Sequence, residues 1–147
     1  MARAEKILII FSNYYEDITE ALLTGATEVL RSSTMEFDTI EVPGVLELPA
    51  ALAMAVKSRK YQGYVILGCV IRGETTHYEI VSNESARAIM NLACKHRLAL
   101  GNGIQTVENR DQAWARASVE GKNNGGGAAR AALAMIKVRK ELRYELQ

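Results

Sequence analysis

The segment Tyr64–Glu79, with the sequence YVILGCVIRGETTHYE, decides the fold class of this chain. Its first half is a continuous apolar run, which is typical of a β-strand covered on both faces. Its second half gathers glycines, threonines, an arginine and a histidine just before a helical pattern. In α/β proteins, anions bind at such strand-to-helix junctions because the first N–H groups of a helix lack partners. The segment therefore predicts an α/β fold with a ligand site at this junction.

The same alternation of strand and helix extends from this segment in both directions. Apolar runs predict four strands, at Ile7–Phe11, Met35–Val42, Gly63–Val70 and Leu98–Val107. The last strand looks weaker, because Gly101-Asn102-Gly103 interrupts it, and a glycine-rich loop is expected at Gly121–Gly127. Strands that alternate with helices predict a parallel sheet with helices on both faces, and one domain over residues 1–147.

Helical spacing predicts which side chains each helix buries. The first helix carries an apolar stripe of Ile18, Ala21, Leu22, Gly25, Ala26, Val29 and Leu30. A second runs from near Glu47 to Arg59, and a third, from near Thr76, turns inward Ile80, Val81, Ala88, Ile89 and Leu92. Asn109 and Gln112 have the spacing of an N-cap for a fourth helix. The last helix has a stripe of Ala131, Met135, Val138, Leu142 and Leu146.

Composition excludes several classes of function. The chain has 147 residues, of which 48% are hydrophobic and 24% charged, and a net charge of +1, so it lacks the basic field of nucleic-acid-binding proteins. It has no apolar run long enough for a membrane span or a signal peptide, and a cytoplasmic location is expected. Cys69 and Cys94 each lie in an apolar run and are expected to be buried free thiols. No Cys/His cluster indicates a metal.

The loops that follow the four strands should meet at one edge of the sheet. These loops are Ser12–Glu16, Pro43–Glu47, Ile71–His77 and Gln105–Asn109. A histidine at the start of a helix can be a surface or capping residue, or a base, because the helix N-terminus disfavours the protonated imidazole. Glu47 at a helix start either complements the helix dipole or accepts hydrogen bonds from a heterocycle. Arg116, in the middle of a helix, either forms a surface ion pair or binds an anion.

Pattern alone thus predicts a small α/β protein that binds an anionic or phosphorylated compound, and it leaves the reaction open. Five strings of residues go further: Ile18–Ala26 (with Leu22, Leu23 and Gly25), Val42–Pro49 (VPGVLELP), Leu67–Tyr78 (LGCVIRGETTHY), Gln112–Ala117 (QAWARA) and Ala128–Met135 (AARAALAM). In this order they resemble the 6,7-dimethyl-8-ribityllumazine synthase family of riboflavin biosynthesis. The resemblance covers roughly residues 7 to 138.

The resemblance implies a flavodoxin-like three-layer sandwich and an enzyme. The implied reaction condenses 5-amino-6-(D-ribitylamino)uracil with 3,4-dihydroxy-2-butanone 4-phosphate, and its products are the lumazine, phosphate and water. It implies no metal or organic cofactor. It also implies a homopentamer or a multiple of one, with active sites between subunits, and riboflavin synthase as a further candidate partner. The main alternative is a flavin- or lumazine-binding pentamer with little or no turnover.

The resemblance also assigns roles to residues of the ring pocket. Tyr14 sits where the family places an aromatic ring against the pyrimidine. Glu47 and the backbone at Val45 and Leu46 sit where the ribityl chain is held. Val70 and Ile71 line the ring pocket.

The remaining implied roles concern the phosphate and proton transfer. Gly73, Glu74 and Thr75 sit where backbone and hydroxyl donors receive the phosphate. Arg116 matches an arginine that reaches this phosphate from the adjacent subunit, and His77 matches the proton-transfer histidine. Asn102 stands where many relatives have a phenylalanine that covers the neighbour's pocket, and Asn124 where many have a lysine.

Overall fold

The computed structural model describes residues 5–142, which form a four-stranded parallel sheet and its covering helices. The elements, in chain order, are β1 (Lys6–Ser12), α1 (Glu16–Ser32), β2 (Glu36–Val42), the 3-10 helix η1 (Val45–Glu47), α2 (Leu48–Ser58), β3 (Gly63–Ile71), α3 (His77–His96), β4 (Leu100–Val107), α4 (Arg110–Ala117) and α5 (Asn124–Glu141). The strand order is β2-β1-β3-β4, and Ile9 of β1 lies opposite Thr39 of β2 and Val65 of β3. The predicted sheet is confirmed.

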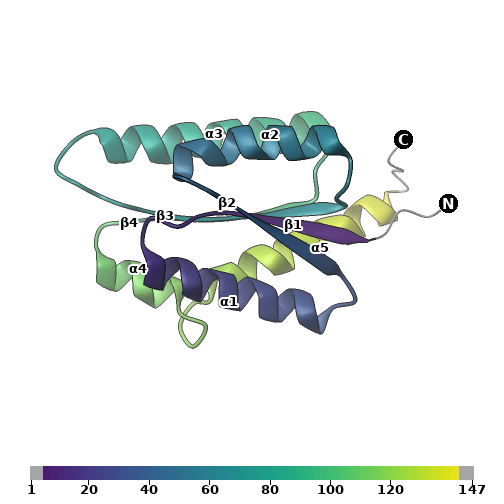
Figure 1. The fold of residues 1–147 in the computed structure, drawn as a ribbon, viewed down its shortest axis with the longest axis horizontal. Helices are drawn as coiled ribbons and strands as arrows, with labels where there is room; N and C mark the ends of the chain where they lie inside the picture. The colour runs from purple at the N-terminus through teal and green to yellow at the C-terminus, as the bar shows by residue number, and fades with distance from the viewer. Residues whose placement is uncertain (1–4, 143–147) are drawn as a thin grey trace.

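The molecule has three layers, with α2 and α3 on one face of the sheet and α1, α4 and α5 on the other (Figure 1). Successive strand residues point to opposite faces, so the strands supply two separate cores. Ile7 and Ile9 of β1 pack toward α1 and α5, whereas Leu8 and Ile10 pack toward α2 and α3. The predicted flavodoxin-like three-layer sandwich is confirmed, and the continuous apolar runs are explained by burial on both faces.

Two predictions about glycine-rich segments are wrong. β4 runs unbroken through Gly101 and Gly103. A glycine is needed at position 101 because α5 crosses the strand so closely that a Cβ there would collide with the carbonyl oxygen of Ala128. The expected loop at Gly121–Gly127 is only partly a loop, since α5 already begins at Asn124. Gly125 lies against the backbone of α1 at the carbonyl of Leu22. These glycines mark close packing between backbones rather than breaks in secondary structure.

The buried faces of two helices also differ from the prediction. In α1 the predicted stripe is confirmed, but on α3 Ile80 is 53% exposed. On α5 the buried positions are glycines, alanines and Ile136. The predicted stripe is exposed at Met135, Val138 and Leu142, while Leu146 lies outside the described residues. α5 is apolar on more than one side, so its sequence did not reveal which side faces α1 and β4. Cys69 is buried as predicted, whereas Cys94 is exposed.

Candidate active site

A cavity of about 360 Å³ opens at the carboxyl edge of the sheet, beside β1 and β3. These neighbouring strands feed helices on opposite faces, α1 below and α3 above in Figure 1, which makes this point the topological switch of the sheet. Open α/β sheets bind their ligands at such a point. The residues that line the cavity are Tyr14, Tyr15, Pro43, Gly44, Val45, Leu46, Glu47, Cys69, Val70, Ile71, His77 and Val81.

One wall of the cavity is the short segment between β2 and α2. Its 3-10 helix is closed by a hydrogen bond from the Glu47 backbone N–H to the Gly44 carbonyl oxygen, at 3.1 Å. Val45 is buried against the sheet, while Leu46 and Glu47 remain exposed. The bare Cα of Gly68 allows this segment to pack closely, since a Cβ there would lie 2.9 Å from Ser12 Oγ and 3.1 Å from Val45. The wall therefore offers an apolar floor and a free carboxylate.

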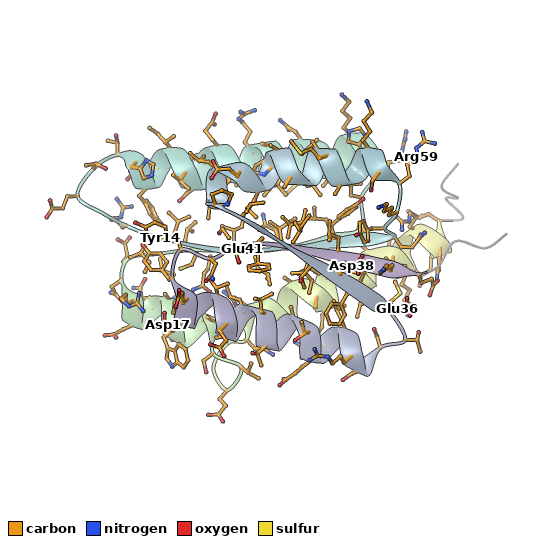
Figure 2. The ribbon with its side chains drawn as sticks, viewed as in Figure 1. Tyr14, Asp17, Glu36, Asp38, Glu41 and Arg59 are labelled. Atoms are coloured by element: carbon orange, nitrogen blue, oxygen red, sulfur yellow. The ribbon has the colours of Figure 1, made fainter. Side chains whose placement is uncertain are left out.

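Aromatic side chains form the opposite wall, after β1. Tyr14 is 75% exposed and meets the ring of Tyr15 edge-on, with 4.9 Å between the ring centroids. Figure 2 shows Tyr14 at the sheet edge and Asp17 in the first turn of α1 below it. Arg110 of α4 donates to both carboxylate oxygens of Asp17, at 2.7 and 2.8 Å, and lies 5.5 Å from the centroid of the Tyr15 ring. The ion pair anchors this wall, and Tyr14 is left free to meet a flat ligand.

The electrostatics of this wall follow from the same contacts. The hydrogen bond from Arg110 lowers the pKa of Asp17 below its usual value. Burial raises the pKa of Tyr15, so its phenol stays neutral at physiological pH. Burial also raises the pKa of the Cys69 thiol at the floor of the cavity. Because Tyr15 and Cys69 are both neutral, neither adds a charge to the cavity.

His77 is the first residue of α3 and lines the cavity with an exposed side chain. Its backbone N–H donates to Thr75 Oγ1 at 3.2 Å, whereas the N-cap residue, Thr76, makes no capping bond with its side chain. The imidazole therefore lies at a helix N-terminus, beside the cavity.

The loop between β3 and α3, residues 72–76, extends beyond the sheet edge in Figure 1. Gly73, Glu74 and Thr75 are exposed on it and do not line the cavity. Arg72 forms ion pairs of 2.8 Å with both Glu79 and Glu108, and its guanidinium lies 4.5 Å from the Tyr78 ring centroid. Because its charge is already paired twice, Arg72 is a poor candidate for binding an anion.

Arg116 and Asn102 also lie outside the cavity of their own chain. Arg116 is half-buried near the end of α4 and donates from Nη1 to the Gln112 carbonyl oxygen at 3.4 Å. Within residues 5–142 no carboxylate forms an ion pair with it. Asn102 is exposed on β4, and its Oδ1 accepts a hydrogen bond from the backbone N–H of Ile104 at 2.9 Å. Within one chain, these two predicted residues do not join the others.

Sequence reasoning left some site residues out. Cys69 and Val81 were assigned only to the core, although both line the cavity. Gln105 was noted only as the start of a loop, but it is buried inside β4. The signal for Gln105 was available, because it falls on the alternating buried face with Gly101, Gly103 and Val107. The residues of β4 that alternate with these, such as Asn102, point to the other face of the sheet, away from α4 and α5.

The described residues offer neither a metal site nor a membrane-spanning helix. Over residues 5–142, no group of three or more histidine, cysteine, aspartate or glutamate side chains could hold a metal ion. Over the same part of the chain, none of the helices combines the length and the apolar character that crossing a membrane requires.

Comparison with known proteins bears on the same cavity. The model of the 6,7-dimethyl-8-ribityllumazine synthase family matches residues 4–140. The chain belongs to this family. It is 54% identical to a 6,7-dimethyl-8-ribityllumazine synthase of Bartonella tribocorum, over 95% of this chain and 93% of the relative. It is 52% identical to one of Agrobacterium fabrum, over 92% and 95%, and 51% identical to 6,7-dimethyl-8-ribityllumazine synthase 1 of Rhizobium meliloti, over 95% and 94%.

Two of the segments that carried the resemblance line the cavity. The segment VPGVLELP that carried the resemblance supplies the wall at Pro43–Glu47, and the segment LGCVIRGETTHY supplies Cys69, Val70, Ile71 and His77. The two segments are distant from each other in the sequence. The parallel sheet brings them together, because they follow the carboxyl ends of β2 and β3, which both pair with β1.

Proposed function

We propose that this chain is an enzyme that condenses 5-amino-6-(D-ribitylamino)uracil with 3,4-dihydroxy-2-butanone 4-phosphate. The products are 6,7-dimethyl-8-ribityllumazine, phosphate and water, in the penultimate step of riboflavin biosynthesis. One observation carries the proposal: in a chain of this family, the cavity at the switch point gathers an aromatic ring, a carboxylate and a histidine, contributed by Tyr14, Glu47 and His77.

The cavity is suited to the ribitylaminouracil. Tyr14 is exposed and can stack on the pyrimidine, and Val70 and Ile71 offer it an apolar edge. Glu47 is exposed at the other wall, where its carboxylate can accept hydrogen bonds from the ribityl hydroxyls, beside the backbone of Val45 and Leu46. These residues bind and orient the first substrate.

The phosphorylated substrate needs donors that the cavity lacks. Gly73, Glu74 and Thr75 lie on the exposed loop at the start of α3, where backbone N–H groups and a hydroxyl can receive a phosphate. Arg116 is the proposed cation, because its planar guanidinium can donate two parallel hydrogen bonds to the phosphate oxygens. Since Arg116 does not line the cavity of its own chain, we place it in the site of an adjacent subunit, together with Asn102.

The chemistry needs little more than orientation and one proton carrier. The substrate amine attacks the ketone and water leaves, which gives an imine. His77 then removes the proton beside the imine, while Arg116 and Thr75 stabilise the charge of the departing phosphate. Ring closure and a last dehydration complete the lumazine. The protein's main contribution is to hold two substrates in a reactive geometry. No cofactor takes part in these steps.

A site that takes Arg116 from a neighbour needs an interface between subunits. The resemblance to the family favours a head-to-tail interface that closes into a ring, and we propose a homopentamer or a multiple of it. The reaction is expected in the cytoplasm, and riboflavin synthase stays a candidate partner because it would consume the product.

The first test mixes the purified protein with both substrates and follows the fluorescence of the lumazine. A control without protein is required, because the condensation proceeds slowly unaided. Formation well above this control is the expected result, and it should fall in Arg116→Ala. No rise above the control, with the lumazine still tightly bound, would instead favour a ligand-binding pentamer.

A second test addresses the shared site. His77→Ala and Arg116→Ala subunits are each expected to be much less active than the wild type as separate oligomers. When the two variants are co-expressed in equal amounts, about a quarter of the sites should combine an intact His77 with an intact Arg116 from the neighbour, and activity should return. Mixed oligomers that stay inactive would place both residues in the same subunit's site.

A further inference from the structure

Gln105 is a buried amide that connects the sheet to α4 and α5. It lies on β4 and is only 4% exposed. A buried amide costs free energy unless its polar atoms find partners, so its contacts report what the side chain does.

Both the nitrogen and the oxygen of the Gln105 amide form hydrogen bonds. Nε2 donates to the carbonyl oxygen of Ala113 in α4 at 2.8 Å and lies 3.5 Å from Cys69 Sγ, at the floor of the cavity. Oε1 accepts from Nδ2 of Asn124, the first residue of α5, at 3.3 Å. The carbonyl of Ala113 can only accept, which fixes the nitrogen on that side. Gln105 therefore ties together β3, α4 and α5.

α4 depends on such contacts more than the other helices do. It has eight residues, Arg110–Ala117, whereas isolated helices below roughly 12–15 residues are marginal in water. Its N-terminus is capped by Asn109, whose Oδ1 accepts from the Gln112 N–H at 2.8 Å. Ala113 lies three residues before Arg116, less than one turn away. The bond from Gln105 thus fixes α4 close to the point from which Arg116 extends.

We propose that Gln105 is a positioning residue that holds α4 so that Arg116 reaches the substrate phosphate. This role rests on the proposed function, in which Arg116 pairs with that phosphate. Gln105 touches neither substrate. Its amide sets the orientation of α4, and a guanidinium that binds two oxygens in a fixed plane is sensitive to such orientation.

The experiment replaces Gln105 by methionine, which has a similar shape but no amide, in the full-length oligomeric enzyme. The KM for the butanone phosphate should rise about five- to tenfold, the loss expected from one well-formed hydrogen bond. The KM for the ribitylaminouracil should stay the same, and kcat should change by less than about twofold. Asn124→Ala, which removes only the 3.3 Å bond, should produce a smaller rise in the same KM.

A double variant separates positioning from mere stability. In the Arg116→Ala background, Gln105→Met should not raise the KM for the phosphorylated substrate any further, because the guanidinium that it positions is gone. Ser85→Ala is the matched control, since Ser85 is another buried polar residue, 1% exposed, on α3 and away from α4. It should leave both KM values unchanged.

Three outcomes would overturn the role of Gln105. An unchanged KM for the butanone phosphate in Gln105→Met, or an equal rise in the Arg116→Ala background, would contradict it while leaving the proposed function standing. A wild-type protein that forms no lumazine above the control would remove the proposed function, and the role of Gln105 with it.

Discussion

The helices on the two faces of the sheet pack in different ways. On one face, α5 meets its neighbours backbone against backbone, at Gly125 beside Leu22 of α1 and at Ala128 beside Gly101 of β4. On the other face, α2 and α3 pack on the sheet through side chains such as Leu48, Leu52 and Ile89.

Because of this difference, we expect one helical layer to matter mainly for the stability of the fold and the other mainly for ligand binding. Where backbones touch, one added methyl group has no space, so the α1/α4/α5 layer tolerates little change. The segment before α2 and the start of α3 form the cavity wall instead, and His77 there is exposed to ligand. We therefore expect substitutions in the first layer to reduce stability, and substitutions at the cavity wall to reduce activity.

The largest expected effect is on stability, in Gly125→Ala. The new Cβ would collide with the Leu22 carbonyl oxygen, which is backbone and cannot move aside, so unfolding should become easier by about 3 kcal/mol or more. Gly127→Ala is the matched control in the same helical turn, where a Cβ meets open space, and it should stabilise the protein by up to about 1 kcal/mol. Urea unfolding of both variants measures the difference. Equal midpoints would contradict the close contact.

The next effect is on activity, in His77→Ala. Loss of a proton carrier is expected to lower kcat by a factor of about 10² to 10⁴, while the unfolding midpoint and the assembly stay at wild-type values because the side chain is exposed. Steady-state kinetics and denaturation of the same preparation provide both numbers. A turnover number equal to that of the wild type would exclude the proton-transfer role.

A smaller effect distinguishes the two cysteines, Cys69 on the face of β3 that α1 and α4 cover and Cys94 on α3. Cys69 is buried under α1 and α4, and burial raises its thiol pKa, whereas Cys94 is exposed on α3. A thiol reagent at pH 8 should therefore modify Cys94 faster, since burial both shields Cys69 from the reagent and keeps its thiol protonated. Mass spectrometry of digested protein measures the two rates, and Cys94→Ser identifies the fast site. Faster labelling of Cys69 would show that the α1/α4/α5 layer opens.

The smallest effect concerns pH and the ion pair between α1 and α4. Because Arg110 lowers the pKa of Asp17 in the folded protein, the pair contributes stability above the usual aspartate value near 3.8, and this contribution is lost as pH falls through the lowered value. The stability difference between wild type and Asp17→Asn should therefore be present at pH 7 and vanish in acid. Glu84→Gln, which breaks an ion pair within α3, is the matched control. A difference that persists at low pH would mean that Asp17 acts through something other than its charge.

The sequence by itself determined the chain's strands, its fold class and its family. Continuous apolar runs such as Gly63–Ile71 are typical of strands covered on both faces, and the string around His77 is long enough to identify the family. Such features depend on neighbours along the chain, which is why local pattern is sufficient to predict them.

Only the tertiary structure decided which sides of α3 and α5 are buried, why β4 runs through Gly101, and that Gln105 joins three elements. The exposed Ile80 and Met135 show the physical reason, because a helix with several apolar sides is oriented by the shape of what it packs against. A glycine that marks a break in one context marks a backbone contact in another. The place of Arg116 outside its own chain's cavity likewise depends on the end of β4 and the path of α4, which no local pattern specifies.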